Sequence, residues 1–128
     1  MRAVPANRML SQITCEGDYI RAVLFDRQSA AETRGFLESV TAAATMHDCT
    51  RVLISVRASR PLFKVDDYGI SDYFSVLRDN PAYRVALLSD SEETHASHRY
   101  IEALARLFRA RVKSFRSEPA ALEWLRDE

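Results

Sequence analysis

The sequence predicts a single α/β domain in which a mixed sheet of about five strands is covered by about four helices. The end of the chain indicates this most clearly, because the strand-like residues 112–116 lead through Ser117 and Pro119 into the helix-like residues 120–125. The same strand-then-helix order recurs upstream, after a hairpin-like start. Each such helix needs a sheet face to cover, and each strand needs helices to shield it, so the alternation favours a layered protein.

The composition is that of an ordinary globular protein. The chain has 128 residues, enough for one hydrophobic core without disulfides or metals, and we expect residues 1–128 to form one domain. Hydrophobic residues make up 47% of the chain and charged residues 28%. No apolar run approaches the ~20 residues of a spanning helix, and residues 1–5 lack the apolar stretch of a secretion signal. We therefore expect a soluble cytoplasmic protein.

The charges balance. The 18 basic and 18 acidic residues give a formal net charge of zero, which argues against a general attraction to nucleic acid or to an anionic membrane. Cys15 and Cys49 are far apart and show no zinc-type spacing, so reduced, packed thiols are expected. The sequence indicates no cofactor.

The chain begins with a segment that predicts a hairpin. Residues 1–8 contain Pro5 and no periodicity, and we expect a loose leader there. Residues 9–15 and 19–25 are predicted strands, and the tripeptide 16–18 between them has turn chemistry. The hairpin is expected to supply one edge of the sheet.

A first helix and a central strand follow. Ser29 and Glu32 have the spacing of a capping box, so a helix is predicted to begin there and to end near His47-Asp48. Its apolar stripe consists of Phe36, Leu37, Val40 and Ala44. Residues 51–56 are a short apolar run rich in β-branched side chains, which predicts a strand at the sheet centre, covered on both faces.

The next strand–helix units read in the same way. Apolar residues spaced i, i+3, i+4 and i+7 before Asn80-Pro81 predict a second helix. These residues are Ile70, Tyr73, Phe74 and Leu77. Residues 83–88 predict another buried strand, after which Asp90 or Ser91 can cap a long third helix. The expected strands 51–56 and 83–88 should be neighbours inside the sheet.

The order of elements, together with Phe115 and the terminal Ala-Leu-Glu-Trp-Leu at residues 121–125, resembles the SpoIIAA-like, STAS-related family of small bacterial domains. The resemblance covers residues 9–126. It implies the fold, in which a β-hairpin precedes βα units and a strand leads into a terminal helix.

The resemblance also implies a regulatory role. Members that resemble anti-anti-sigma factors carry Asp-Ser-Ser-Gly-Leu at the start of the second helix, with a phosphorylatable serine. The matching residues 66–70 read Asp-Asp-Tyr-Gly-Ile, so Tyr68 stands where the serine would be and a serine phosphoswitch is not expected. In related regulators this region meets protein partners, which implies a homodimer or a regulatory contact. Tyr68 and Tyr73 are the candidate interaction residues, because aromatic side chains are favoured at interfaces.

A second candidate site is the loop after the predicted central strand. Ligands of open α/β sheets bind beyond the carboxyl ends of the strands. Basic and hydroxyl side chains there suit an anionic group, with Leu62 and Phe63 covering an apolar portion. The candidate ligand-binding residues are Arg57, Ser59, Arg60 and Lys64, with Asp26 and Asp90 on the same rim. The alternative is a solvated loop whose apolar residues dock on the core.

Other constellations are weaker. His95 and His98 lie i, i+3 on the third helix with glutamates nearby, but no further ligand of zinc type accompanies them. The excess of basic side chains over residues 99–116 suits a helix end as well as phosphates. The spacing of the three glycines does not match a P-loop or a dinucleotide-binding motif, and no Gly-x-Ser-x-Gly motif occurs.

These observations favour a non-enzymatic protein, since no nucleophile with an oriented base can be assembled. The leading hypothesis is a regulatory or protein-interaction module that uses the second helix and the loop before it. The alternative is a domain that binds a small anionic or lipid-like molecule. An enzyme comes third, and nucleic acid is not the expected partner.

Overall fold

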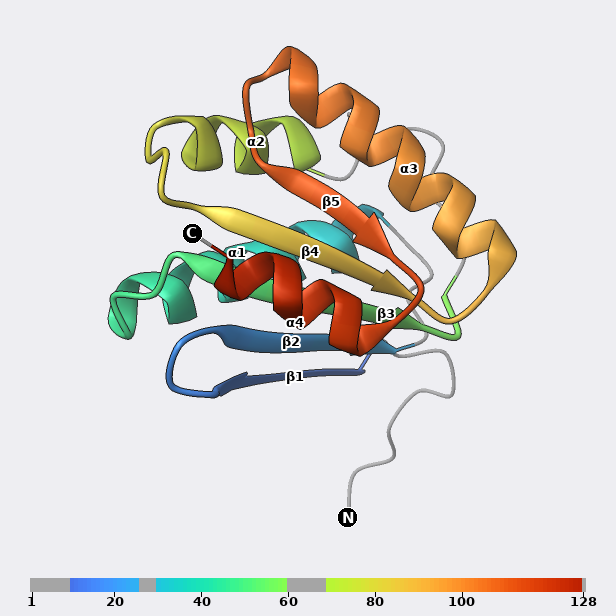
Figure 1. Cartoon of the computed structure of the whole chain (residues 1–128), viewed down its shortest axis with the longest axis horizontal. Helices are drawn as coiled ribbons and strands as arrows, with labels where there is room; N and C mark the ends of the chain where they lie inside the picture. Colours follow the sequence, from blue (N-terminus) through green and yellow to red (C-terminus); the bar gives the residue numbers. More distant parts are fainter. Residues whose placement is uncertain (1–9, 26–29, 60–68, 128) are drawn as a thin grey trace.

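The described part of the chain forms one mixed five-stranded sheet with helices on both faces (Figure 1). The computed structural model describes residues 10–25, 30–59 and 69–127. The strands are β1 (Leu10–Cys15), β2 (Ile20–Phe25), β3 (Arg51–Arg57), β4 (Arg84–Ser89) and β5 (Val112–Phe115). The helices are α1 (Ala30–Met46), α2 (Ile70–Arg78), α3 (Glu92–Leu107) and α4 (Glu118–Arg126). The predicted α/β architecture is confirmed, while the expected leader 1–8 and the capping serine Ser29 lie outside the described residues.

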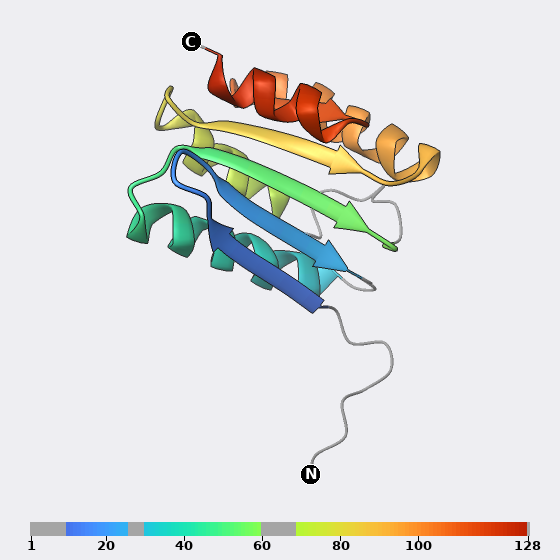
Figure 2. The ribbon, with the colours of Figure 1, turned by 60° about the horizontal axis from the view of Figure 1, so that its bottom comes forward.

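The strand order in the sheet is the order in the chain. β1 is antiparallel to β2, and the other neighbours pair in parallel. Right-handed crossovers that all step in the same direction place their helices on the same face of a sheet. Accordingly, α1, α2 and α3 cover one face, and α4, which follows the last strand, covers the other (Figures 1 and 2). β3 and β4 are neighbouring interior strands, as predicted.

Two apolar cores flank the sheet. The larger one lies between the sheet and α1, α2 and α3, and Ile54 of β3 belongs to it. The smaller one lies under α4, where Leu53 packs with Ala121 and Leu125. Because successive side chains of a strand point to opposite faces, β3 contributes to both cores. This explains why residues 51–56 read as a nearly continuous apolar run.

Residues 16–19 form the turn of the hairpin. The backbone N–H of Glu16 donates to the carbonyl oxygen of Tyr19 at 2.9 Å, and Gly17 takes a φ of 95°. Glycine adopts this left-handed conformation at no steric cost, so the predicted turn chemistry is used where it is needed. The turn sets the register in which Thr14 lies opposite Arg21.

Helices α1 and α3 end in the same way. After α1, the N–H of Cys49 donates to Ala44 O at 2.9 Å, and Asp48 has a φ of 49°. After α3, the N–H of Ala110 donates to Ala105 O at 2.9 Å, and Arg109 has a φ of 60°. Both ends are Schellman motifs, in which a left-handed residue lets the chain turn back and satisfy the last carbonyls. Each motif directs the chain into the next parallel strand.

Serines begin the last two helices. Ser91 Oγ accepts a hydrogen bond from the Thr94 N–H at 3.1 Å, so Ser91 caps α3. Ser117 Oγ accepts from the Ala120 N–H at 3.5 Å at the start of α4. Of the two predicted caps for α3, the structure uses Ser91 and leaves the Asp90 carboxylate available for another contact.

Candidate functional site

The carboxyl ends of β3 and β4 bring together three of the predicted ligand-binding residues. Asp90 Oδ2 accepts a hydrogen bond from the Ala58 N–H at 3.1 Å, across the gap between the two strands. Ser59 Oγ donates to the Arg57 carbonyl oxygen at 3.0 Å. Arg57, Ser59 and Asp90 are therefore neighbours at this edge, as expected for residues that follow adjacent parallel strands. The remaining candidates, Arg60, Lys64 and Asp26, lie outside the described residues.

The backbone at this edge takes an uncommon conformation. Ala58 has a φ of 48°, in the left-handed region that residues with a Cβ seldom adopt. Such a conformation costs on the order of 1 kcal/mol and is found where surrounding contacts hold it. The bond from Asp90 supplies such a contact, so Asp90 shapes the start of the loop that follows β3.

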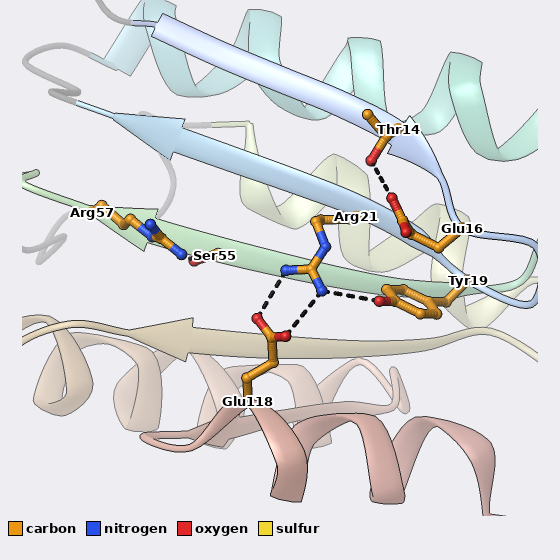
Figure 3. A network of polar contacts seen from close by, with 7 residues as sticks. All are labelled: Thr14, Glu16, Tyr19, Arg21, Ser55, Arg57 and Glu118. Carbon is orange, nitrogen blue, oxygen red and sulfur yellow. Dashed lines mark hydrogen bonds and ion pairs between the residues drawn. The ribbon is translucent and has the colours of Figure 1, made fainter.

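Arg57 is directed over the sheet. Its guanidinium carbon lies 5.7 Å from the Phe25 ring centroid, and its Nε donates to Ser55 Oγ at 3.3 Å (Figure 3). The cation therefore lies on the face that α4 covers in part, and it rests on an aromatic ring. This geometry holds the guanidinium of Arg57 beside Phe25 and Ser55.

A small cavity lies within the larger core. Its volume is about 50 Å³, and its walls come from the sheet and from α1, α2 and α3. The wall is apolar except for a few groups, among them Thr33 and Tyr73, whose hydroxyl oxygens are buried without a hydrogen-bond partner among the described residues. His98, also buried, adds an imidazole from α3. A buried hydroxyl without a partner costs about 1–3 kcal/mol, so these groups set the cavity wall apart from the rest of the apolar core.

A groove of about 380 Å³ lies outside this cavity, between α1 and α2. Leu37 of α1 and Tyr73 of α2 line both the groove and the cavity. The two spaces are thus separated by side chains that belong to both walls. Charged residues lie around the groove, namely Arg34, Glu38 and Asp72.

Gly69 lets α1 and α2 approach each other at the groove. It precedes α2 with a φ of 72°, and a Cβ added to it would lie 3.2 Å from Cγ of Arg34. Both the left-handed backbone and the close Arg34 stem favour glycine here. Gly69 is the glycine that matches the SpoIIAA-like motif in the sequence. Its backbone angle and its contact with Arg34 give a physical reason for a glycine at this position.

Tyr73, one of the two candidate interaction residues, does not lie on the exposed surface. The residue is 8% exposed and packs in the larger core, and burial raises the pKa of its phenol, which stays neutral. The sequence pattern indicated this burial, because Tyr73 falls on the apolar stripe of its helix, three residues after Ile70. Thr33 was not among the candidate residues, although its position three residues before Phe36 places it on the buried stripe of α1. Tyr68 lies outside the described residues.

A polar network on the opposite face joins β2 to α4. The Arg21 guanidinium donates to both carboxylate oxygens of Glu118, at 2.8 and 3.0 Å, and to the Tyr19 hydroxyl at 3.0 Å (Figure 3). The Arg21 contact lowers the pKa of the Glu118 carboxyl and raises that of the guanidinium. We infer that this network holds α4 against the sheet, because Arg21 and Glu118 bind each other.

Three further features were considered from the sequence: a metal site, a basic surface and a membrane-spanning helix. In the described ranges, no group of three or more His, Cys, Asp or Glu side chains is placed to hold a metal. The basic stretch 99–116 is partly neutralised, since Arg106 pairs with Glu102 at 2.9 Å and Arg116 with Glu92 at 2.6 Å. No helix of the described chain combines the length and the apolar character that crossing a bilayer requires.

The two cysteines differ in their surroundings. Cys49 is buried and belongs to the larger core, as expected for a packed thiol. Cys15, at the end of β1, is exposed, contrary to the expectation that both thiols are packed. A strand at the edge of the sheet has fewer neighbours to bury its side chains, which explains the difference.

Comparison with known proteins identifies the fold. The structure is similar to that of an uncharacterized protein of the DUF3478 family from Shewanella loihica PV-4, which is described as having a SpoIIAA-like fold. The similarity covers 98% of this chain and 99% of that one, with a TM-score of 0.53 and 16% sequence identity. No protein-family model matches the sequence, and no curated protein does. The chain is thus a small α/β protein with a SpoIIAA-like fold, in agreement with the resemblance seen in its sequence.

Proposed function

We propose that the protein is a non-enzymatic binding module for a small, neutral, lipid-like molecule. Its polar end would enter the cavity in the larger core, where the hydroxyls of Thr33 and Tyr73 lie, and its apolar part would lie in the groove between α1 and α2. The observation that carries this proposal is that Leu37 and Tyr73 line both spaces. A rearrangement of these two side chains would join the spaces.

The sizes of the two spaces support this arrangement. At about 50 Å³ the cavity is too small for a ligand by itself, whereas the groove measures about 380 Å³. Joined, they fall within the roughly 300–1,000 Å³ of sites that hold small molecules. The ligand would therefore be elongated, with one end inside the core.

The chemistry of the walls points to a neutral molecule. The polar groups on the cavity wall include the hydroxyls of Thr33 and Tyr73, and its other residues are largely aliphatic or aromatic. A charged end would be placed in an apolar interior at a high free-energy cost. The anionic ligand expected from Arg57, Ser59 and Asp90 is not the one we propose, because none of these residues lines the cavity or the groove.

Titration with decanol and with decanoate tests the proposal. Isothermal calorimetry should show saturable binding of decanol, and weaker binding of decanoate, whose carboxylate carries a charge. Thr33→Val and Tyr73→Phe each remove one hydroxyl at nearly constant shape, and each should weaken decanol binding by about three- to tenfold. Tyr100→Phe removes an exposed hydroxyl from α3 and is the matched control. An absence of saturable decanol binding would contradict the proposal.

A regulatory protein-interaction role is the second candidate. It is favoured by Val76 of α2, which is 41% exposed and lines the same groove. An apolar side chain exposed beside a groove suits contact with a partner. Thr33→Val separates the two roles: its hydroxyl is interior, so the substitution should change ligand binding and leave a surface contact through Val76 unaltered.

A further inference from the structure

The two edge strands of the sheet, β1 and β5, differ in their contacts with neighbouring side chains. At the β5 edge, Glu102 Oε1 accepts hydrogen bonds from both the N–H and the Oγ of Ser114, each at 2.8 Å. This strand also contains Lys113. A satisfied edge group and a charged side chain are the usual means by which a sheet edge is protected from pairing.

The β1 edge has no such protection among the described residues. Its sequence, Leu-Ser-Gln-Ile-Thr-Cys, has neither a charged residue nor a proline, and Ser11, Gln12 and Cys15 are exposed. In contrast to Ser114, no backbone group of β1 is hydrogen-bonded by a described side chain. Within residues 10–25, 30–59 and 69–127, no strand pairs with the outer side of β1.

The hairpin turn determines which backbone groups of β1 face outward. Glu16 and Tyr19 are a hydrogen-bonded pair, and in an antiparallel ladder hydrogen-bonded and non-hydrogen-bonded pairs alternate. By the register of the hairpin, Thr14 and Gln12 direct their N–H and C=O groups toward β2. The other residues of β1 that oppose non-hydrogen-bonded partners direct theirs outward. These residues are Ser11, Ile13 and Cys15.

We propose that β1 pairs with β1 of a second copy of this chain, antiparallel and about a two-fold axis at Ile13. The outward-facing residues are spaced symmetrically about Ile13, so Ile13 would oppose its own copy and Ser11 would oppose Cys15 of the second copy. Every outward N–H and C=O would then have a partner.

The charges select a second copy as the occupant of this edge. A two-fold contact places each residue close to its own copy, and like charges directly opposite one another destabilise a strand pair. β1 has no charged side chain, so it meets itself without repulsion. Pairing of β1 with the β5 edge would instead build an open filament, and the Glu102–Ser114 bonds oppose it. The contact would produce a closed dimer with one continuous sheet, and it does not depend on the proposed ligand.

Disulfide trapping tests the register. In a Cys15→Ser background, Ile13→Cys would place two thiols in directly opposed residues, with Cα atoms roughly 5.5 Å apart, within the range that a disulfide spans. Mild oxidation should then convert most of the protein to a covalent dimer on a non-reducing gel. Gln12→Cys in the same background is the matched control, because its two copies would lie diagonally, about 7–8 Å apart, and should cross-link poorly.

Sedimentation equilibrium tests the contact itself. The unmodified chain should show a concentration-dependent dimer, weak because a short strand pair buries little area compared with a standard interface. Ser11→Pro removes an outward N–H while leaving the β1–β2 bonds intact, so it should abolish the dimer and leave the melting temperature nearly unchanged. A chain that stays monomeric at every concentration overturns the proposal. A dimer that Ser11→Pro does not weaken and Ile13→Cys does not trap overturns it as well.

Discussion

Arg21 and Glu118 are 97 residues apart in the chain, yet two parallel hydrogen bonds of 2.8 and 3.0 Å join the guanidinium to the carboxylate. The pair attaches α4 to β2, a strand beyond those that α4 covers with its apolar side chains. Bidentate geometry makes such a pair stronger than a typical surface ion pair. It is therefore a defined target for stability measurements.

Glu118→Gln should lower stability at neutral pH and lose its effect in acid. Arg21 lowers the pKa of Glu118, so the pair contributes fully above the ordinary glutamate pKa of about 4.3, and its contribution is lost as the pH falls through the lowered value. Urea unfolding at a series of pH values should show the difference from wild type shrinking below about pH 4. Because the Glu118 side chain is 37% exposed, we expect a difference of at most about 1 kcal/mol. Glu123→Gln, at an exposed position of the same helix, is the matched control.

Tyr73→Phe should raise the stability of the ligand-free protein by about 1 kcal/mol. The substitution removes a buried hydroxyl that has no partner among the described residues and retains the ring that packs in the core. Chemical denaturation measures the change, and Tyr100→Phe on the surface should be neutral. The same substitution should weaken decanol binding, and this opposition of effects is characteristic of a binding residue. A destabilised Tyr73→Phe would mean that the hydroxyl has a partner.

Arg109→Gly should stabilise the protein by about 1 kcal/mol. Arg109 holds a φ of 60° in the Schellman motif after α3, a conformation that costs a residue with a Cβ about this amount and glycine nothing. Thermal unfolding should show a higher melting temperature. Arg109→Ala keeps the Cβ and removes the charge, so it should give no such gain. An equal effect of both variants would place the cause in the charge.

Asp90→Ala should destabilise the turn after β3 by about 1 kcal/mol, through loss of the bond to the Ala58 N–H. Ala58→Gly should be stabilising or neutral, because glycine tolerates the φ of 48°. In the Ala58→Gly background, Asp90→Ala should destabilise the protein less, because glycine adopts this backbone conformation without strain. A double-mutant cycle by urea unfolding measures this coupling, and strictly additive effects would contradict the role assigned to Asp90.

Much of the fold was predictable because its signals are local. The turn at Gly17, the serine caps and the apolar runs of β3 and β4 each depend on residues close together in the sequence. The predicted cluster of Arg57, Ser59 and Asp90 also followed, because the carboxyl ends of neighbouring parallel strands share one edge.

The candidate site was less predictable for two physical reasons. Thr33 and Tyr73 lie on apolar helix stripes, where a pattern of residues cannot distinguish a satisfied core from a cavity wall. The Arg21–Glu118 pair joins the second strand to the last helix, and no local pattern links segments so far apart. Only the packing of α1 against α2, with Gly69 beneath Arg34, shows that the groove and the cavity share a wall.

The order of the strands has a consequence for how the protein forms. Since each strand lies beside the one that precedes it in the chain, every new βα unit can be added to an existing edge as the polypeptide leaves the ribosome. Only the last helix must reach back to the beginning, where Arg126 pairs with Asp18 and Glu118 with Arg21. A nascent chain stalled before α4 would already contain the five described strands, and synthesis of α4 would then cover the second face.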